Sequence, residues 1–166
     1  MKANKPVIAI EPDMSDRLMD ALAYGALSLL FLLPLSRFAE LPETIPIHFN
    51  GSGEADGFGS RYLIWMFPVL GGLMFLVFTY MLWNPHKLNY SRPVTLENAE
   101  AIYQIGSRIL RFLRLTISVL LAYLAFVVIS TATGAQSGTG KWFLPVLLVG
   151  LYVPLGYWVF RLFRVK

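Results

Sequence analysis

The stretch YLIWMFPVLGGLMFLVFTYMLW, residues 62–83, contains no charged side chain. An α-helix rises about 1.5 Å per residue, so a helix of this length reaches across a hydrocarbon core of roughly 30 Å. The stretch therefore predicts a transmembrane helix.

The overall composition supports a membrane environment. Hydrophobic residues make up 56% of the chain and charged residues 14%, and the mean hydropathy is +0.58. A soluble domain of 166 residues needs a mostly polar exterior, for which too few polar residues are present. The chain has no cysteine, which excludes a disulfide framework, a thiol nucleophile and a zinc site built from cysteines.

Three further apolar stretches are long enough to cross a bilayer. We predict an all-α membrane protein with a single membrane domain over residues 1–166 and four transmembrane helices, near residues 18–38, 62–83, 115–133 and 142–160. A cleaved signal peptide is the alternative for the first helix. The acidic sequence EPDMSD ahead of it and the lack of a small-x-small cleavage site favour an uncleaved helix.

The distribution of basic residues predicts the orientation of the helices. Most lie before the first helix, between the second and third, or after the fourth: Lys2, Lys5, Arg17, Lys87, Arg92, Arg108, Arg111, Arg114, Arg161, Arg164 and Lys166. By the positive-inside rule both termini are cytoplasmic, segment 84–114 is cytoplasmic, and the loop 37–61 is external. No nucleic-acid partner is expected, because the basic residues flank apolar runs and form no single patch.

The cytoplasmic segment 84–114 is expected to contain an amphipathic helix that leads into the third span. Apolar residues recur at helical spacing opposite a polar stripe. One interpretation is a cytoplasmic interface in which Arg108, Arg111 and Arg114 contact a partner or anionic lipid head groups. The other is a plain juxtamembrane helix whose arginines set its depth.

The external loop 37–61 has a composition that predicts order. Ile45, Ile47 and Phe49 alternate with Pro46 and His48, as in a short extended strand. The glycines that follow permit tight turns or close backbone approach. Prolines toward the outer ends of the spans are either kinks that open a cavity beneath this loop or ordinary membrane-helix prolines.

The polar residues of the loop allow three chemical interpretations. Oxygen-bearing side chains at alternate positions suit calcium, but Leu63 stands where an EF-hand needs its bidentate glutamate. His48 with Glu54 and Asp56 could hold a metal or act in acid/base chemistry. A histidine hydrogen-bonded within the loop is the third interpretation and the one we adopt, so we assign no catalytic residue, no metal and no other cofactor.

The segments LPETIPIHFNGSGEADGFGSR (41–61) and NPHKLNYSRPVTLENAEAIYQIGSRILRFLR (84–114) carry a family resemblance. The chain resembles an uncharacterised family of bacterial multi-pass membrane domains that includes the immunity protein of the sporulation-delaying toxin system. Its loop pattern is matched by Pro42, Ile45, Pro46, His48, Phe49, Asn50, Gly53, Asp56 and Ser60. The resemblance implies a location in the bacterial inner membrane and a role in immunity or signalling.

We therefore expect a binding or sensing module that recognises an extracytoplasmic peptide, lipid or toxin through the 41–61 loop. The alternatives are an enzyme at the membrane interface that uses His48, Glu54 and Asp56, and a small facilitator. None of the core apolar stretches contains an ionisable group, unlike most ion-coupled transporters. The residues expected to bind ligand are Pro46, His48, Asn50, Gly53, Glu54, Asp56, Ser60 and Arg61.

Overall fold

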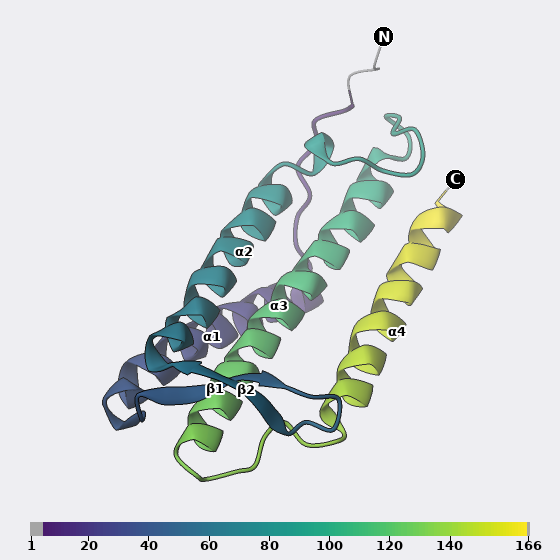
Figure 1. Cartoon of the computed structure of the whole chain (residues 1–166). Coiled ribbons are helices and arrows are strands. Elements are labelled where there is room, and N and C mark those ends of the chain that lie inside the picture. Colours follow the sequence, from purple (N-terminus) through teal and green to yellow (C-terminus); the bar gives the residue numbers. More distant parts are fainter. Residues whose placement is uncertain (1–4, 166) are drawn as a thin grey trace.

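The computed structural model describes residues 5–165 (Figure 1). Within them lie four long helices: α1 (Met14–Arg37), α2 (Met66–Trp83), α3 (Ala99–Ala132) and α4 (Phe143–Arg164). Three short 3-10 turns, η1 (Phe38–Glu40), η2 (Arg61–Trp65) and η3 (Pro85–Lys87), extend or connect them. Each long helix, with η1 and η2 added to α1 and α2, is long and apolar enough to cross a membrane. The predicted multi-pass membrane protein is confirmed at this level.

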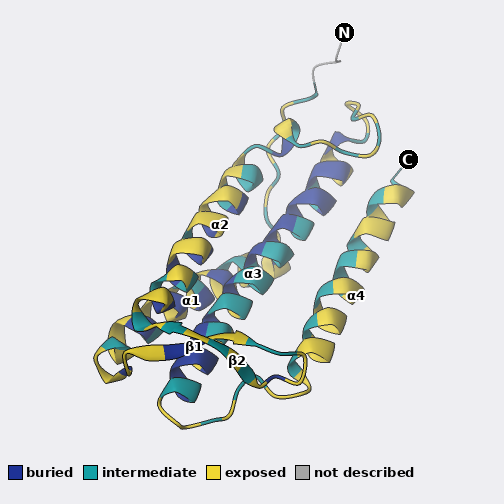
Figure 2. Ribbon diagram, in the orientation of Figure 1, coloured by how far each residue is buried: buried dark blue, intermediate teal, exposed yellow. Residues whose placement is uncertain are grey.

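Helix α3 is the centre of the bundle. It packs against the other three long helices and is buried along much of its length (Figure 2), whereas α4 has no buried residue and, among the long helices, packs chiefly against α3. We predicted a helix in segment 84–114 that leads into the third span. In the structure, residues 99–114 and that span form one uninterrupted helix of 34 residues, which is about 50 Å long.

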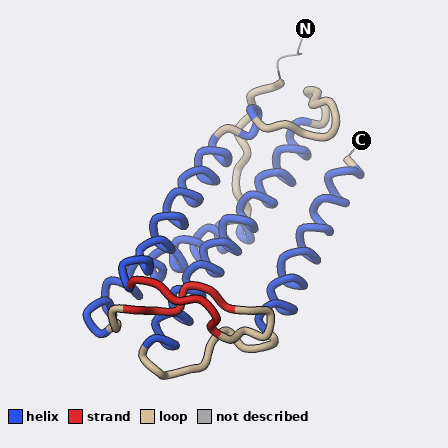
Figure 3. The backbone as a smooth tube through the Cα atoms, in the orientation of Figure 1, coloured by secondary structure: helices blue, strands red, loops and turns tan. Residues whose placement is uncertain are grey.

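The all-α prediction is wrong for the loop between α1 and α2, which contains a two-stranded antiparallel sheet (Figure 3). Strand β1 (Thr44–Phe49) pairs with β2 (Ala55–Ser60), and residues 44–60 are referred to below as the hairpin. The second strand was missed because its inward side consists of Ala55, Gly57 and Gly59 and so lacks an apolar alternation.

The glycines of β2 have a packing reason. A Cβ atom at Gly57 would lie 2.9 Å from Cβ of His48, and one at Gly59 would lie 2.9 Å from Cδ1 of Leu63. Side chains from β1 and η2 thus occupy the space that larger residues in β2 would need.

The hairpin is anchored to the helices by a shared apolar core. Ile45 of β1 is fully buried and belongs to one cluster with Leu30 of α1, Ile64 of η2 and Ala125 and Val128 of α3. The burial of Ile45 fixes the hairpin across this end of the bundle, which we call the hairpin end.

Residues near both ends of the chain lie at the opposite end of the bundle (Figure 1). There, Ile8 and Ile10 pack against Ala99, Ile102 and Tyr103 of α3. The hydroxyl of Tyr103 donates a hydrogen bond to the carbonyl of Pro6 over 2.9 Å. The segment ahead of α1 is therefore ordered along the first turns of α3.

Candidate ligand-binding site

The tip of the hairpin is held by Asn50. Its side-chain oxygen accepts hydrogen bonds from the backbone N–H groups of Ser52 (2.9 Å) and Glu54 (3.1 Å). Its backbone carbonyl accepts another from the N–H of Gly53, over 2.9 Å. An asparagine that bonds the backbone two residues ahead is a common way to stabilise a turn. Asn50 therefore shapes the tip.

Gly53 joins the hairpin to the connection between α3 and α4. Its φ of +84° is favourable for glycine, and its carbonyl accepts a hydrogen bond from the N–H of Thr139 over 2.9 Å. A Cβ atom at Gly53 would lie only 2.7 Å from the backbone nitrogen of Gly140. Glu54 pairs with Gly138 in an isolated bridge beside this contact. The position of the hairpin thus depends on that of the α3–α4 connection.

His48 and Asp56 face each other across the hairpin. Nδ1 of His48 lies 2.5 Å from Oδ1 of Asp56, and the side chains are 70% and 44% exposed. The register shift on either side of His48 brings the two side chains together. With Nδ1 bonded to the carboxylate, Nε2 is left to meet a ligand. The histidine is hydrogen-bonded within the loop, as we predicted.

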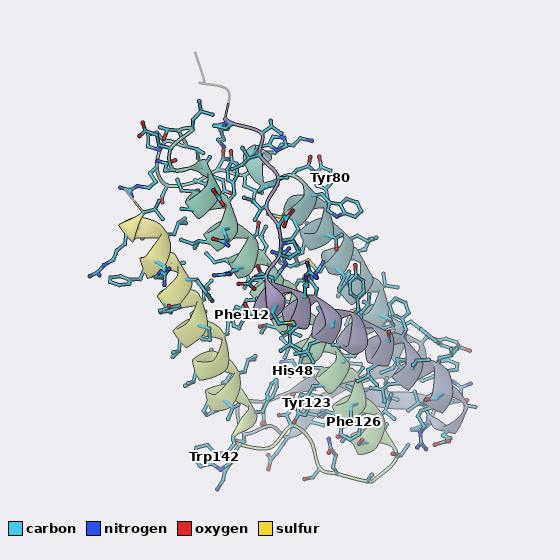
Figure 4. All side chains as sticks on the ribbon, turned by 180° about the vertical axis from the view of Figure 1, so that it is seen from behind. His48, Tyr80, Phe112, Tyr123, Phe126 and Trp142 are labelled. Atoms are coloured by element: carbon cyan, nitrogen blue, oxygen red, sulfur yellow. The ribbon has the colours of Figure 1, made fainter. Side chains whose placement is uncertain are left out.

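A pocket of about 330 Å³ lies beneath the hairpin. The hairpin contributes His48 and neighbouring residues to its lining, and Figure 4 shows His48 in the same half of the molecule as Tyr123 and Trp142. Volumes of roughly 300–1,000 Å³ with an apolar lining and few polar groups are typical of small-molecule sites. Apolar residues from three helices complete the wall: Met66, Phe67, Leu124, Val128, Phe143 and Leu144.

The structure separates the eight predicted ligand-binding residues into two groups. His48, Asn50 and Gly53 line the pocket, and Asp56 bonds His48. The others do not line it: Pro46 is buried in β1, Glu54 is exposed at the tip, Ser60 accepts a hydrogen bond from the N–H of Tyr62, and Arg61 donates one to the carbonyl of Leu41.

No group of three or more histidine, cysteine or acidic side chains that could hold a metal ion occurs within residues 5–165. His48 and Asp56 alone supply fewer ligands than the four that zinc usually takes. The candidate site therefore consists of the pocket beneath the hairpin and the side chain of His48 in its wall.

The three arginines assigned to a cytoplasmic interface lie in a row of ion pairs between α3 and the start of α1. Arg108 pairs with Asp13 and Asp16, Arg111 pairs with Asp20, and Arg114 pairs with Asp20. The side chains of Arg111 and Arg114 are only 10% and 4% exposed, so they present little surface to a partner. Arg114 also donates to the Thr79 hydroxyl of α2 over 3.0 Å.

The sequence carried a signal for this row. Aspartates 13, 16 and 20 and arginines 108, 111 and 114 recur every three or four residues, which places each set on one face of a helix. The match between two such faces of opposite charge, far apart in the sequence, predicts that they pair.

The four helices thus fit a multi-pass membrane protein, with a hairpin between the first two candidate spans. Residues 25–72 match the model of a family described as Domain of unknown function (DUF1648). The match includes the second half of α1, the whole hairpin and the beginning of α2. His48 and Asp56 both lie within the matched segment, whereas the pocket is also lined by residues of α3 and α4 outside it.

A segment of 45 residues is 47% identical to an uncharacterised protein of Archaeoglobus fulgidus. It covers 27% of this chain and only a quarter of the length of that relative. No solved structure matches the chain significantly. The comparisons therefore support a domain family of unknown function.

Proposed function

We propose that the protein is a membrane-bound binding module that recognises an extracytoplasmic ligand through the hairpin. One observation carries the proposal: an apolar pocket lies under the hairpin, and His48, oriented by Asp56, stands in its wall. A ligand with an apolar part for the pocket and a hydrogen-bonding or charged group for Nε2 of His48 fits this arrangement. Peptides, lipids and membrane-active toxins all have that character.

The distribution of basic residues supports placing the hairpin outside the bacterial inner membrane and both termini in the cytoplasm. The resemblance of the 41–61 segment to the family of the sporulation-delaying immunity protein supports a role in protection or signalling. In this proposal the ion-paired row of α1 and α3 holds the bundle together on the cytoplasmic side.

A second candidate is an enzyme at the membrane interface. The specific observation is the 2.5 Å contact between the Asp56 carboxylate and Nδ1 of His48, because a carboxylate at Nδ1 orients a histidine for general-base catalysis through Nε2. A binding module keeps its ligand unchanged, whereas an enzyme converts it. The two candidates therefore differ in the chemical state of what the protein releases.

The proposal is tested by identifying what copurifies with the protein. We would reconstitute wild type, His48→Ala, Asp56→Asn and Glu43→Gln in nanodiscs made with the membrane lipids of the host. Bound molecules would be released by denaturation and identified by mass spectrometry. Glu43 is an exposed acidic residue outside the pocket lining and is the matched control.

We expect one molecular species that is enriched with wild type and Glu43→Gln and depleted with His48→Ala and Asp56→Asn. Its recovery in unchanged form supports binding, and its conversion by wild type alone supports the enzyme. If all four proteins release the same species in the same amounts, the hairpin is not the recognition element.

A further inference from the structure

A second and larger cleft lies between α3 and α4, next to the pocket beneath the hairpin. Its volume is about 630 Å³, and its apolar walls include Leu115, Val119 and Leu120 of α3 and Phe143, Val146 and Leu147 of α4. All these residues belong to the helix segments that are apolar enough to cross a membrane. The cleft therefore lies between those parts of α3 and α4 that are apolar enough to be in the hydrocarbon of a bilayer.

The first turns of α4 form one wall of the cleft. Helix α4 faces the bundle with partly buried residues that recur every three or four positions, among them Phe143, Leu147, Trp158 and Leu162. The Phe143 ring stacks on Tyr123 of α3 at 5.3 Å between ring centres. No α4 residue is buried, and Val146 in the cleft wall is 67% exposed.

The cleft and the pocket are adjoining compartments. Thr139 and Phe143 belong to the walls of both. The Tyr123 hydroxyl donates to the carbonyl of Thr139 over 3.3 Å, and the N–H of Thr139 donates to Gly53 of the hairpin. Phe143 and Thr139 therefore form the wall that the cleft and the hairpin pocket have in common.

We infer that the cleft holds the hydrocarbon chain of an anionic lipid of the bilayer, and that this lipid reaches the hairpin pocket laterally from the membrane. The inference rests on the proposed function and names its ligand class. It is carried by the apolar walls of the cleft, by the two wall residues that the cleft shares with the pocket, and by the charge at its mouth.

The chemistry of the cleft selects a hydrocarbon chain over a peptide. Its α3 and α4 walls offer few polar groups, and the Tyr123 hydroxyl is already hydrogen-bonded. A peptide backbone placed there would leave N–H and C=O groups unsatisfied in an apolar medium, whereas an acyl chain has no such groups.

The mouth of the cleft near the hairpin carries a positive charge. Lys141 is exposed and immediately precedes Trp142, which lines the cleft and is 69% exposed. An anionic head group at this mouth would meet the ammonium group of Lys141, and tryptophan is favoured at the level of lipid head groups.

The test uses palmitic acid with a photoactivatable diazirine in the middle of its chain, incorporated into phosphatidylethanolamine vesicles that contain the full-length protein. Adducts are mapped by mass spectrometry. We expect adducts concentrated on the cleft-lining residues of α3 and α4 and scarce on the equally exposed lipid-facing surface of α2. Adducts spread over all four helices in proportion to their exposure would overturn the inference.

A substitution that fills the cleft sharpens the test. Val119→Phe intrudes on the cleft, whereas Val77→Phe makes the same change on the lipid-facing side of α2; the wild-type residues are 49% and 53% exposed. We expect Val119→Phe to reduce cleft adducts by about tenfold, since it displaces about two buried methylene groups, and Val77→Phe to leave them unchanged. Equal adduct yields from Val119→Phe and wild type would overturn the inference.

The head group is tested with Lys141→Gln and with a neutral probe, the corresponding diazirine alcohol. We expect the substitution to reduce cleft adducts of the acid and not those of the alcohol, and an equal effect on both would overturn the anionic assignment. These readouts do not require His48. If the cleft binds no lipid but a ligand is still lost in His48→Ala, this inference alone is refuted. If the cleft binds lipid but no ligand depends on His48, the proposed function is refuted.

Discussion

Nη2 of Arg114 in α3 lies 2.5 Å from Oδ1 of Asp20 in α1, although the two residues are 94 positions apart in the chain. The arginine side chain is 4% exposed and the aspartate side chain 27%. Removing one partner of such a pair leaves a charge in a poorly solvated place, which is costly even where the intact pair adds little net stability. The contact therefore makes the α1–α3 packing sensitive to single substitutions.

Asp20→Asn should destabilise the bundle by about 3 kcal/mol, because Arg114 loses its charged partner in a buried place. The measurement is the apparent melting temperature in detergent, followed by size-exclusion chromatography after heating. The control is Glu40→Gln, which breaks the Arg37–Glu40 pair of side chains that are 56% and 54% exposed. An exposed pair contributes about 0–1 kcal/mol to stability. Equal effects of the two substitutions would therefore contradict a larger contribution from the buried Asp20–Arg114 pair.

The acidic residue that caps α1 should make the protein sensitive to low pH. The backbone N–H of Asp16 lowers the pKa of Asp13 below its usual 3.8, with help from the Ser15 hydroxyl and the Arg108 charge. A carboxyl whose pKa is lower in the folded state stabilises that state above about pH 4, and the contribution is lost as the pH falls through the folded pKa. We expect the melting temperature to fall in that range.

Asp13→Asn tests this pH dependence, because asparagine also caps helices well and the substitution removes chiefly the charge. Wild type should melt higher than Asp13→Asn at neutral pH, and the difference should shrink below about pH 4. Glu11→Gln removes a neighbouring exposed carboxyl and is the control. A difference that stays constant down to pH 3 would show that the Asp13 charge does not contribute.

Gly53→Ala should loosen the hairpin from the α3–α4 connection. The added Cβ would lie 2.7 Å from the nitrogen of Gly140 and would occupy a residue with φ of +84°. Strain of this kind costs about 1–3 kcal/mol. Hydrogen exchange at the amide of Thr139, which bonds the Gly53 carbonyl, should become faster.

Gly51→Ala is the matched control for Gly53→Ala. It changes the same tip, but no heavy atom lies within 4 Å of its added Cβ. Unchanged exchange at Thr139 is expected. If both alanines accelerate hydrogen exchange at Thr139 to a similar extent, the effect of Gly53→Ala does not come from its contact with Gly140.

The orientation of the bundle can be tested by single cysteines, because the natural chain has none. Ser52 and Ser137 lie in the hairpin tip and the α3–α4 connection, which contact each other, and Ser91 lies between α2 and α3. All three are exposed. In intact cells, a membrane-impermeant maleimide should label Ser52→Cys and Ser137→Cys but not Ser91→Cys. Labelling of Ser91→Cys alone would show that the orientation is the reverse of the one predicted.

Several features followed from the sequence because they depend on local composition. Apolar length determines which segments can cross a bilayer, so four helices long and apolar enough to span one were predicted correctly without any knowledge of contacts. The alternation of Ile45, Ile47 and Phe49 predicted an extended strand where β1 lies, because strand periodicity is also local. A hydrogen bond of His48 within its own loop was predicted because polar side chains lie close to it in the sequence, but its partner Asp56 was not singled out from Glu54.

Other features depend on which distant surfaces meet. The glycine-rich strand β2 forms because β1 supplies its hydrogen-bond partners and leaves room only for small residues. Arg111 and Arg114 resemble membrane-surface arginines in the sequence, but the aspartates of α1 pair with them once the two helices pack. The pocket and the adjoining cleft are lined by residues from elements far apart in the sequence. Tertiary structure alone decides such spaces, because a cavity is determined by the relative positions of its walls and not by the residues in any one of them.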